Sequence, residues 1–430
     1  MKLLKNKVSN LLKRILYVLP ISFRKTVVLV REWYWRVRIT SWEKQQYPNL
    51  PEITSHKRKV KNVLIYHISG LTHAGTEKNL QLIANSLVDE YEVYFMYGEK
   101  GSESERKETL DSRIKLIPFS YELNEVNLPH RLHGMKPHLK EVLVAKDIDL
   151  IITASPGYAH YPWNIISKIP IVLSNVFGAP TLQKNIAATI FMSETVQNHA
   201  EGWVGRSKNS YTRFLPIGKL PPKNCRELGG LLRKRLGILD TDFVFGRIGR
   251  DDNNIFDPIG IRAWQKIAPE YPHAHLLVMS PPPILVKIVK EEKISRVHFL
   301  PPSGKEDDVW AFHGAIDAMS HFRRDGETSG VAIAESLTIG NPIITHKSHI
   351  WNAHLEYLTA DCSRVAEIDD FNGYADYMEE FIDLKINHSE KWQQYIEASK
   401  QCGEKNFSPV SYIESIQSIV SKLHYKNDSI

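Results

Sequence analysis

The sequence predicts an α/β protein with two Rossmann-like, doubly wound parallel-sheet domains and a basic helical arm before them. Three observations lead to this fold class. The 430 residues are too many for one ordinary core and suit two domains, at roughly 150 residues per domain. From Lys61 onward, short apolar strands alternate with helical stretches, as in parallel α/β layers. Before that point the chain is strongly basic, which separates an arm from the body.

The arm is assigned to residues 1–58. Residues 1–60 contain 14 Lys and Arg but only three acidic residues, a net charge of +11, whereas the whole chain carries +6. The body from residue 61 onward therefore carries −5. An affinity of the whole protein for polyanions is not implied, and no nucleic-acid partner is expected.

Within the arm, one stretch has the period of an amphipathic helix with basic borders. Its apolar residues recur at steps of three and four, at Leu4, Val8, Leu11, Leu12, Ile15 and Leu19. Such a segment suits an anionic leaflet, where each Lys or Arg adds about 1 kcal/mol. We expect residues 1–50 to bind an anionic membrane surface. The alternatives are a helix packed on the body with a solvated basic face, and nucleic-acid binding, which no recognition motif supports.

The arm predicts neither a membrane span nor a signal peptide. Its apolar stretches, Ile15–Phe23 and Thr26–Val30, are shorter than the about 20 residues that a bilayer core of ~30 Å requires. No Ala precedes Ala74, so an A-x-A-like cleavage site is missing. The three Cys are far apart and have no metal-site spacing, which fits a reducing compartment. We expect a cytoplasmic protein, peripheral at the cytosolic face of a membrane.

The first predicted domain is residues 59–220. It begins with a strand, a glycine-containing turn and a helix at Thr76–Asp89. The predicted strands are Val63–Ser69, Tyr91–Tyr97, Ile114–Ile117, Leu150–Thr153 and Ile171–Ser174.

The second predicted domain, residues 221–395, begins after the turn Leu220-Pro221-Pro222. Its predicted strands are Phe243–Ile248, His275–Met279, Val297–Leu300, Ala318–His321 and Pro342–Thr345. The helical pattern of Ser389–Leu423 is broken near Pro409, and residues 396–430 are expected to pack back on the first domain. Two similar α/β units imply a cleft, the default place for a ligand.

The first strand leads into a glycine-containing turn, Gly70–Lys78. Its glycines allow close approach of a ligand, and the following helix N-terminus offers unpaired N–H groups. A phosphate loop needs G-K-[ST], whereas Gly75 is followed by Thr76-Glu77, so ATP hydrolysis is disfavoured. On this segment alone, a plain strand-to-helix turn is the alternative.

The strongest motif is residues 325–335, D-G-E-T-S-G-V-A-I-A-E, in which two carboxylates flank a loop of small residues. A helix beginning near Ser329 would point its first N–H groups at a diphosphate. Glu335, about two turns beyond Glu327, would accept hydrogen bonds from hydroxyls; a helix-surface carboxylate is the alternative. No His or Asp completes a metal site, so a polyhydroxylated ligand is favoured.

This run resembles the E-x7-E signature of retaining glycosyltransferases of family 4, which have the GT-B fold of two Rossmann-like domains. Three further segments are similar to that family: Gly75-Thr76-Glu77, Phe191–Glu194 with Pro216–Gly218, and the G-R loop Phe245–Arg250. The likeness covers about residues 60–425 and leaves out the arm.

The resemblance implies how the donor diphosphate is held. Arg250, beside Gly249, would grip it, and the amides of Ser329, Gly330 and Val331 would hold the distal phosphate. An Arg and a helix N-terminus stabilise a departing nucleoside diphosphate without a metal ion. No cofactor other than the nucleotide-sugar donor is expected.

The resemblance also implies contacts to sugar and acceptor. Glu327 would meet the donor sugar's hydroxyls near the reacting carbon, and Glu335 would bind the ribose. Gly75 and Thr76 would let the acceptor and the donor phosphate approach the first domain. Relatives often place a His near the acceptor, and His160 is the candidate here, with an ordinary surface His as the alternative.

The sequence departs from the family after Arg250. Relatives carry a Lys about five residues later, whereas Arg250 is followed by D-D-N-N-I-F. A missing charge-assisted hydrogen bond is worth roughly 1.5 to 3 kcal/mol. The cations that might replace it are Lys305, Arg323, Arg324 and Lys347, while His321 is interpreted as a packing residue at a strand end.

These features predict a retaining, metal-independent glycosyltransferase that moves a sugar from a nucleoside-diphosphate sugar to an acceptor hydroxyl. The arm is the reason to expect a lipid-linked or surface glycan as acceptor, as in lipopolysaccharide or capsule biosynthesis. Two alternatives remain open. One is a soluble transferase that makes a small glycoside, and the other is a non-catalytic sugar-nucleotide-binding or scaffold protein with this fold.

Overall fold

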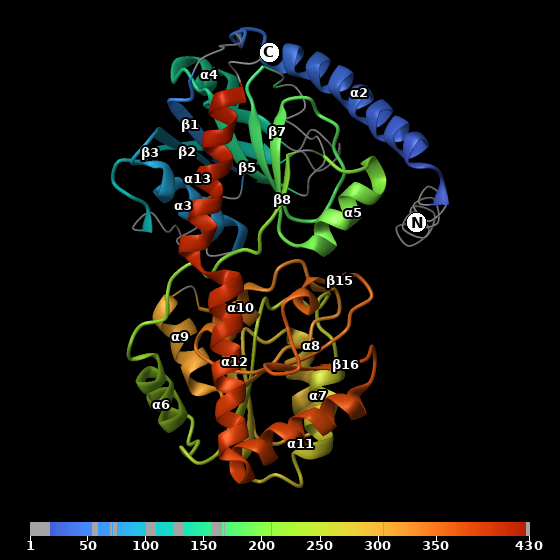
Figure 1. The fold of residues 1–430 in the computed structure, drawn as a ribbon, viewed down its shortest axis with the longest axis vertical. Helices are drawn as coiled ribbons and strands as arrows, with labels where there is room; N and C mark the ends of the chain where they lie inside the picture. Colours follow the sequence, from blue (N-terminus) through green and yellow to red (C-terminus); the bar gives the residue numbers. More distant parts are fainter. Residues whose placement is uncertain are drawn as a thin grey trace. The chain divides into compact units, whose positions relative to one another are not determined.

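The computed structural model describes residues 18–53, 59–68, 71, 75–99, 109–123, 132–155, 166, 168–207, 209–303 and 305–426. The chain divides into two compact units (Figure 1). Unit 1 comprises Met1–Arg213 and Tyr412–Ile430, and unit 2 comprises Phe214–Ser411. The division precedes the expected boundary at residue 221, because Leu215 and Ile217 are buried with the residues of unit 2. Nearly all of the predicted amphipathic stretch at residues 4–19 lies outside the described residues.

Unit 1 is built on a mostly parallel sheet. Its strands are β1 (Asn62–His67), β2 (Glu92–Gly98), β3 (Lys115–Leu123), β4 (Leu132–Lys136), β5 (Leu150–Ser155), β6 (Ile171–Asn175), β7 (Ile186–Phe191) and β8 (Ser210–Thr212). In the described part of the unit, their order is β4-β3-β2-β1-β5-β6-β7-β8, and only the β3–β4 pair is antiparallel. All five strands predicted for the first domain are found in this sheet.

The core of unit 1 explains why its central strands are apolar throughout. Residues 63–67 of β1 are all buried, because helices and connecting segments cover the sheet. On one face, Leu64 and Tyr66 pack with Phe119 of β3 and with Leu139 of α4 (Leu139–Ala145). The other described helices of this unit include α3 (Gly75–Leu87) and α5 (Glu194–Val204).

Helix α2 (Ile21–Gln46) packs beside α5 (Figure 1). Its two acidic residues, Glu32 and Glu43, are buried. Glu32 accepts hydrogen bonds from Thr181 Oγ1 at 2.7 Å and from the Leu182 amide at 2.9 Å. Glu43 is 2% exposed and pairs with Lys140. This later part of the arm is therefore a helix packed on unit 1, and it contacts the unit through charges as well as through apolar side chains. The alternatives for residues 4–19 stay predictions, because nearly all of that stretch lies outside the described residues.

The outward face of α2 is apolar. Its exposed large apolar side chains are Ile21, Phe23, Leu29, Val30, Trp33, Tyr34 and Val37. Exposed basic residues accompany them, and both acidic residues of the helix are buried. Among the described residues, no helix combines the length and the apolar character needed to span a bilayer.

Unit 2 is built on a fully parallel sheet. Its strands are β9 (Phe243–Ile248), β10 (Ala274–Met279), β11 (Val297–Leu300), β12 (Ala318–Ser320), β14 (Ile343–His346) and β16 (Ser363–Ala366). Within the described residues, the order is β11-β10-β9-β12-β14-β16. The helices are α6 (Cys225–Arg235), α7 (Ile259–Ile267), α8 (Pro283–Glu291), α9 (Glu306–Ala315), α10 (Val331–Thr338), α11 (Phe371–Asn387) and α12 (Ser389–Phe407).

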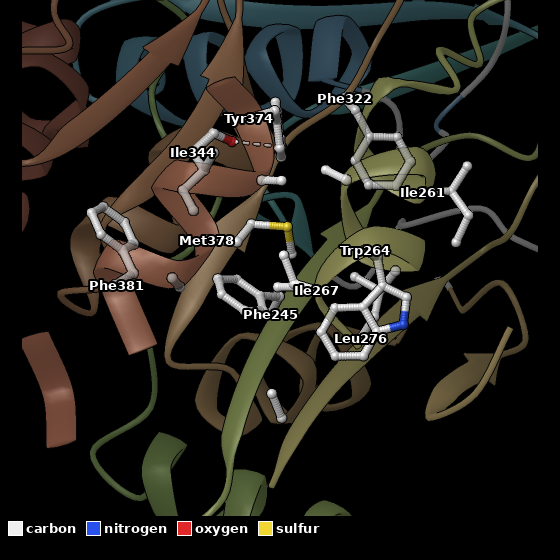
Figure 2. Close-up of a cluster of buried hydrophobic side chains, with 14 of the residues drawn as sticks. Phe245, Ile261, Trp264, Ile267, Leu276, Phe322, Ile344, Tyr374, Met378 and Phe381 are labelled. Carbon is white, nitrogen blue, oxygen red and sulfur yellow. Dashed lines mark hydrogen bonds between the residues drawn. The ribbon is translucent and has the colours of Figure 1, made fainter. Parts of the chain in front are cut away.

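Alternate residues of β9 enter two separate cores. Phe243 and Phe245 pack against Trp264 of α7 and Phe381 of α11 on one face (Figure 2). Val244 faces the opposite core, which contains residues of α6, α9 and α10. Helices therefore cover both faces of the sheet, and the predicted doubly wound α/β architecture is confirmed for unit 2.

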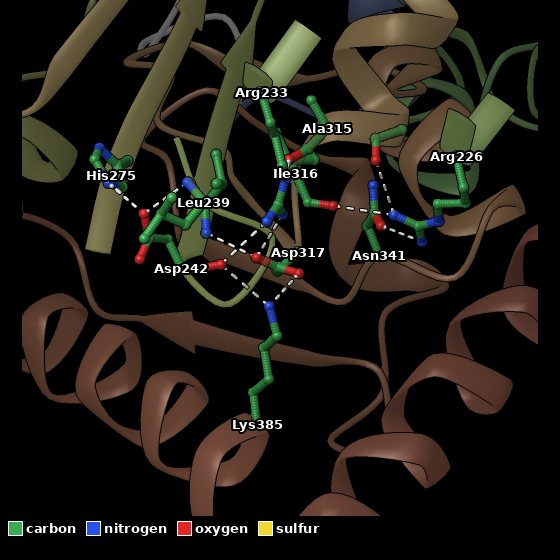
Figure 3. Close-up of polar contacts among 12 residues, drawn as sticks. Arg226, Arg233, Leu239, Asp242, His275, Ala315, Ile316, Asp317, Asn341 and Lys385 are labelled. Carbon is green, nitrogen blue, oxygen red and sulfur yellow. Dashed lines mark hydrogen bonds and ion pairs between the residues drawn. The ribbon is translucent and has the colours of Figure 1, made fainter. Parts of the chain in front are cut away.

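A buried polar network lies where the strands of this sheet begin (Figure 3). Asp317, just before β12, contacts Arg233 Nη2 at 2.8 Å and Lys385 Nζ at 2.7 Å. It also accepts a hydrogen bond from the Val244 amide. Arg233 donates further to the carbonyls of Ala315 and Asp242. The network ties α6 and α11 to the amino edge of the sheet.

The C-terminal helices divide between the units. Helix α12 belongs to unit 2, whereas α13 (Pro409–Lys426) belongs to unit 1 from Tyr412 onward. Within unit 1, Gln417 donates to the Ser86 carbonyl at 2.9 Å. The predicted break at Pro409 is confirmed, and the return to the first unit begins later than residue 396, because α12 packs on α10.

Candidate functional site

Two loops meet at the carboxyl edge of the unit 2 sheet, the one that follows β9 and the one that follows β12. The Arg324 amide donates to the Ile255 carbonyl at 3.0 Å, and Phe256 forms an antiparallel bridge with Arg323. The Arg250 segment and the 325–335 motif, far apart in the sequence, therefore share one edge. In parallel α/β sheets this edge is where ligands bind.

The Glu327 carboxylate is held at one oxygen. Glu327 ends the two-residue strand β13 (Gly326–Glu327), which pairs with β15 (Trp351–Asn352). Its Oε1 lies 3.0 Å from Nε2 of His321 and accepts a hydrogen bond from Nη1 of Arg323 at 3.3 Å. Within the described residues, Oε2 has no hydrogen-bond partner. One oxygen is thus fixed in place and the other is available as an acceptor.

The neighbours of Glu327 keep it ionised. Burial raises its pKa, but the hydrogen bond from His321 and the charge of Arg323 outweigh burial and lower the pKa to about 2. Because an ionised carboxylate only accepts hydrogen bonds, Nε2 of His321 carries a proton. His321 is buried, as a packing residue would be, but it also positions Glu327, which the sequence did not indicate.

Helix α10 begins at Val331, two residues after the expected start. Its N-cap, Gly330, has φ +91°, and a Cβ there would lie 2.5 Å from the Tyr357 hydroxyl. That hydroxyl donates to the Ser329 carbonyl at 3.0 Å, and Ser329 Oγ accepts from the Leu215 amide at 2.9 Å. The loop is held on both sides, so the first amides of α10, which have no partner inside the helix, are held in position.

Glu335 lies inside the unit. It is 7% exposed, and its Oε2 lies 3.3 Å from Nε2 of His313 on α9. The other nitrogen of His313 lies 2.9 Å from the Ser336 hydroxyl. The helix-surface alternative is therefore wrong for Glu335. Contact with a nucleotide ribose stays a prediction.

Of the cations considered as replacements for the missing Lys, Arg323 is the one that contacts Glu327. Two hydrogen bonds at 2.6 and 3.0 Å also join Arg323 to Asp325. Burial lowers the pKa of Arg323, but these two carboxylates raise it above its ordinary value. Lys347 pairs with Glu367 instead. Arg323 is therefore a positioning group for Glu327 whose hydrogen bonds are largely committed.

Arg250 differs from Arg323 in making no side-chain hydrogen bond or ion pair within the described residues. Gly249 and Arg250 are exposed directly after β9. Across the same described residues, no group of three or more His, Cys, Asp and Glu side chains is arranged to hold a metal ion.

A buried histidine next to this site was not singled out by the sequence. His354 donates from Nε2 to the His346 carbonyl at 3.1 Å, and burial together with the charge of His321 lowers its pKa to about 4. His354 lies in the short helix Ala353–Glu356, which follows β15. A search for sequence motifs does not detect such a helix.

The remaining site candidates belong to unit 1. Gly75 and Thr76 begin α3 and follow β1 in the chain. The next residue, Glu77, is buried, with Oε1 at 3.9 Å from Nδ1 of His67. The turn is thus a strand-to-helix connection with a buried acid, and its contact with a ligand stays a prediction. His160 lies outside the described residues.

Comparisons with known proteins relate this chain to solved glycosyltransferase structures. No family model and no curated protein matches the sequence. The structure of HepE from Anabaena in complex with UDP and glucose is similar over 84% of this chain and 100% of that chain, with 17% identity and a TM-score of 0.64. A glycosyltransferase from Rickettsia africae matches over 84% and 98%, with 11% identity and a TM-score of 0.64.

A third similar structure is WaaG, described as a glycosyltransferase involved in lipopolysaccharide biosynthesis. It matches over 82% of this chain and 99% of that chain, with 13% identity and a TM-score of 0.60. At such low identity these likenesses establish the fold. With two parallel-sheet α/β units that match glycosyltransferase structures over nearly their whole length, the chain has the GT-B fold.

Proposed function

We propose that this protein is a retaining glycosyltransferase that moves a sugar from a nucleoside-diphosphate sugar to an acceptor hydroxyl. The observation that carries the proposal is the arrangement at Glu327. Its ionised carboxylate has one oxygen held by His321 and Arg323 and the other available to a sugar hydroxyl. The Anabaena structures with UDP and with UDP-glucose support a nucleotide sugar as donor.

In this proposal the departing diphosphate is stabilised by groups that already have the right charge. Arg250 offers a guanidinium that makes no hydrogen bond or ion pair within the described residues, and the first amides of α10 point out of the helix N-terminus. Both favour the negative charge that develops as the bond between sugar and phosphate breaks. The leaving phosphate accepts the acceptor's proton on the same face, so no separate base and no metal ion are required. Glu335 binds the ribose.

The test is donor turnover by the wild-type chain and by Glu327→Gln. Release of nucleoside diphosphate is measured with UDP-, GDP- and ADP-sugars, and the anomeric configuration of the product is read by NMR. We expect retention, and a loss of about 100- to 1,000-fold in kcat for Glu327→Gln, comparable to the loss of one transition-state contact. Glu397→Gln, an exposed acid on α12, is the matched control.

Two results would count against the proposal. An inverted product would overturn the retaining mechanism. Binding of nucleotides without turnover of any donor would favour the non-catalytic, sugar-nucleotide-binding alternative.

We propose further that the acceptor is part of a lipid-linked or surface glycan, reached from the cytosolic face of a membrane. The outward face of α2 supports this, because Phe23, Val30 and Trp33 are about half exposed or more while Glu32 and Glu43 are buried. A surface of aromatic, aliphatic and basic side chains without exposed acids suits an anionic leaflet. The role of WaaG in lipopolysaccharide biosynthesis gives this acceptor class a precedent in the same fold.

Liposome co-sedimentation tests this part of the proposal. Val30→Ser combined with Trp33→Ser is expected to release the protein from anionic vesicles by at least tenfold, whereas Leu231→Ser, an equally exposed apolar residue on α6, leaves binding unchanged. Deletion of residues 1–17 measures how much of the vesicle binding depends on the segment before α2. Wild-type protein that stays in the supernatant with anionic vesicles would overturn the membrane assignment.

A further inference from the structure

Arg247 is a buried arginine whose side chain has no hydrogen-bond acceptor among the residues that the structure describes. It is the penultimate residue of β9 and only 3% exposed. Its Nη1 is fully buried without a hydrogen-bond partner, and no other atom of its guanidinium makes a hydrogen bond or ion pair within the described residues. The ring of Phe322 is a favourable neighbour, and its centre lies 5.2 Å from the guanidinium carbon. A buried charge in this state is unfavourable unless a partner completes it.

Arg247 lies directly beneath an exposed glycine. A Cβ at Gly249 would be 3.7 to 3.8 Å from three atoms of the guanidinium, although Gly249 itself is exposed. The backbone of Gly249 is not in the left-handed region, so its conformation does not require glycine. The missing side chain at Gly249 therefore leaves the guanidinium close to the surface of the loop.

The electrostatic surroundings place Arg247 beside the Glu327 site. Burial, and then the positive charge of Arg323, lower the pKa of Arg247 to about 10, although Tyr374 and Glu327 act in the opposite direction. The group is cationic at neutral pH. Figure 2 shows Phe322 and Tyr374 together at one end of the apolar cluster around β9. Arg247 thus stands where this apolar core ends and the carboxyl edge begins.

We propose that Arg247, approached over Gly249, is an anion-binding residue for the ligand of this site. The inference rests on the proposed function and extends it by naming a contact that the family resemblance does not assign. A guanidinium binds a phosphate or a carboxylate equally well, so the anion is either the donor's diphosphate or the carboxylate of an acidic donor sugar. Arg323 is committed to Asp325 and Glu327, whereas the two arginines of the β9 segment, Arg247 and Arg250, have no acceptor within the described residues.

Calorimetric titration with pyrophosphate, UDP, UDP-glucose and UDP-glucuronic acid tests this site. Arg247→Met is expected to weaken binding about 10- to 100-fold, the effect of one charge-assisted contact. Loss for all four probes assigns the diphosphate, and loss for UDP-glucuronic acid alone assigns the sugar carboxylate. Arg262→Met, an arginine of α7 that pairs with Glu292, is the matched control and leaves every affinity unchanged.

A second variant separates ligand binding from a structural role. Gly249→Ala places a methyl group at ordinary van der Waals distance from the guanidinium, so the fold tolerates it while access to Arg247 is covered. We expect it to weaken the same probes about tenfold or more. Without ligand, Arg247→Met should melt at or above the wild-type temperature, because an unpaired buried charge is removed.

The results distinguish this inference from the proposed function. Wild-type affinity for the nucleotides in both variants would overturn the Arg247 site alone. A lower melting temperature for Arg247→Met with unchanged affinities would make Arg247 a structural residue. Failure of the wild-type chain to bind any probe would contradict the proposed function and this site together.

Discussion

The two edges of the unit 2 sheet treat their charged residues in opposite ways. At the amino edge, Arg233 and Lys385 are buried or half-buried and bonded to Asp317 and to backbone carbonyls (Figure 3). At the carboxyl edge, Arg247 and Arg250 have no acceptor within the described residues. Strand β9 runs from the amino edge to the carboxyl edge. The two sets of charged residues therefore lie at opposite ends of the same strand and do not divide the unit into a stable and an unstable part.

The contrast indicates which edge is organised for stability and which for a ligand. A cavity of about 500 Å³ at the amino edge is lined in part by Arg226, Arg233 and Lys385. Arg226 donates there to the carbonyls of Ile316 and Ile339, so its cation is already satisfied. Size alone therefore does not identify a ligand site. A cation without an acceptor in the protein is expected where a ligand from solution provides the acceptor.

The largest effect on the free energy of unfolding is expected when the ion pairs at the amino edge are removed. Asp317→Ala leaves Arg233 and Lys385 without their shared carboxylate, and removing one member of a buried ion pair costs about 3 to 5 kcal/mol. Urea unfolding should show this loss, while the nucleotide affinity of the folded protein stays unchanged. Asp361→Ala, at an exposed acid, should stay within about 0.5 kcal/mol of wild type. A stability loss below about 1 kcal/mol for Asp317→Ala would remove the contrast between the edges.

A smaller effect of the opposite kind is expected at the carboxyl edge. Arg250→Ala removes an exposed cation that bonds to nothing in the described protein, so the free energy of unfolding should change by less than about 0.5 kcal/mol. Affinity for a nucleoside diphosphate should fall by about 1.5 to 3 kcal/mol. Paired unfolding and titration measurements check both numbers. Destabilisation without a loss of affinity would show that Arg250 serves the fold.

The sequence predicted β9 and β11 from their own composition and missed β16. Strands β9 and β11 begin and end at the predicted residues, since their apolar runs are bounded by turns on both sides. Strand β16 reads S-R-V-A and was not predicted, because pairing with β14 makes it a strand rather than its own composition. The local pattern is sufficient for a strand with an apolar run of its own, whereas a strand such as β16 forms through tertiary pairing.

For the site, the spacing of residues 325–335 pointed to Glu327 and the family resemblance pointed to Arg250, but neither pointed to the groups that surround them. His321 precedes Glu327 by six residues, and only the β13 turn brings its imidazole to the carboxylate. The sequence does contain a signal for Arg247. It continues the alternation of Phe243 and Phe245 on the apolar face of β9, and a charged residue in that register indicates a buried cation.

The smallest expected effect concerns pH at the carboxyl edge. Burial, followed by the charge of His321, lowers the pKa of His354 from an ordinary 6.5 to about 4, so the folded state keeps this imidazole neutral. The unfolded chain takes up the proton first. The stabilisation is therefore complete above pH 6.5 and is lost as the pH falls toward 4. Between pH 7.5 and 5.5 this single group should remove about 1 kcal/mol.

Urea unfolding of the wild type and of His354→Gln at both pH values isolates this contribution from that of the other histidines. The variant should lose about 1 kcal/mol less than the wild type over that interval. Equal losses would show that His354 takes no part in the pH dependence. Because the pKa of Glu327 is about 2, this carboxylate stays ionised over the same interval, and nucleotide affinity should hold while stability falls. Stability and ligand binding at one edge of one sheet would then be separable by pH alone.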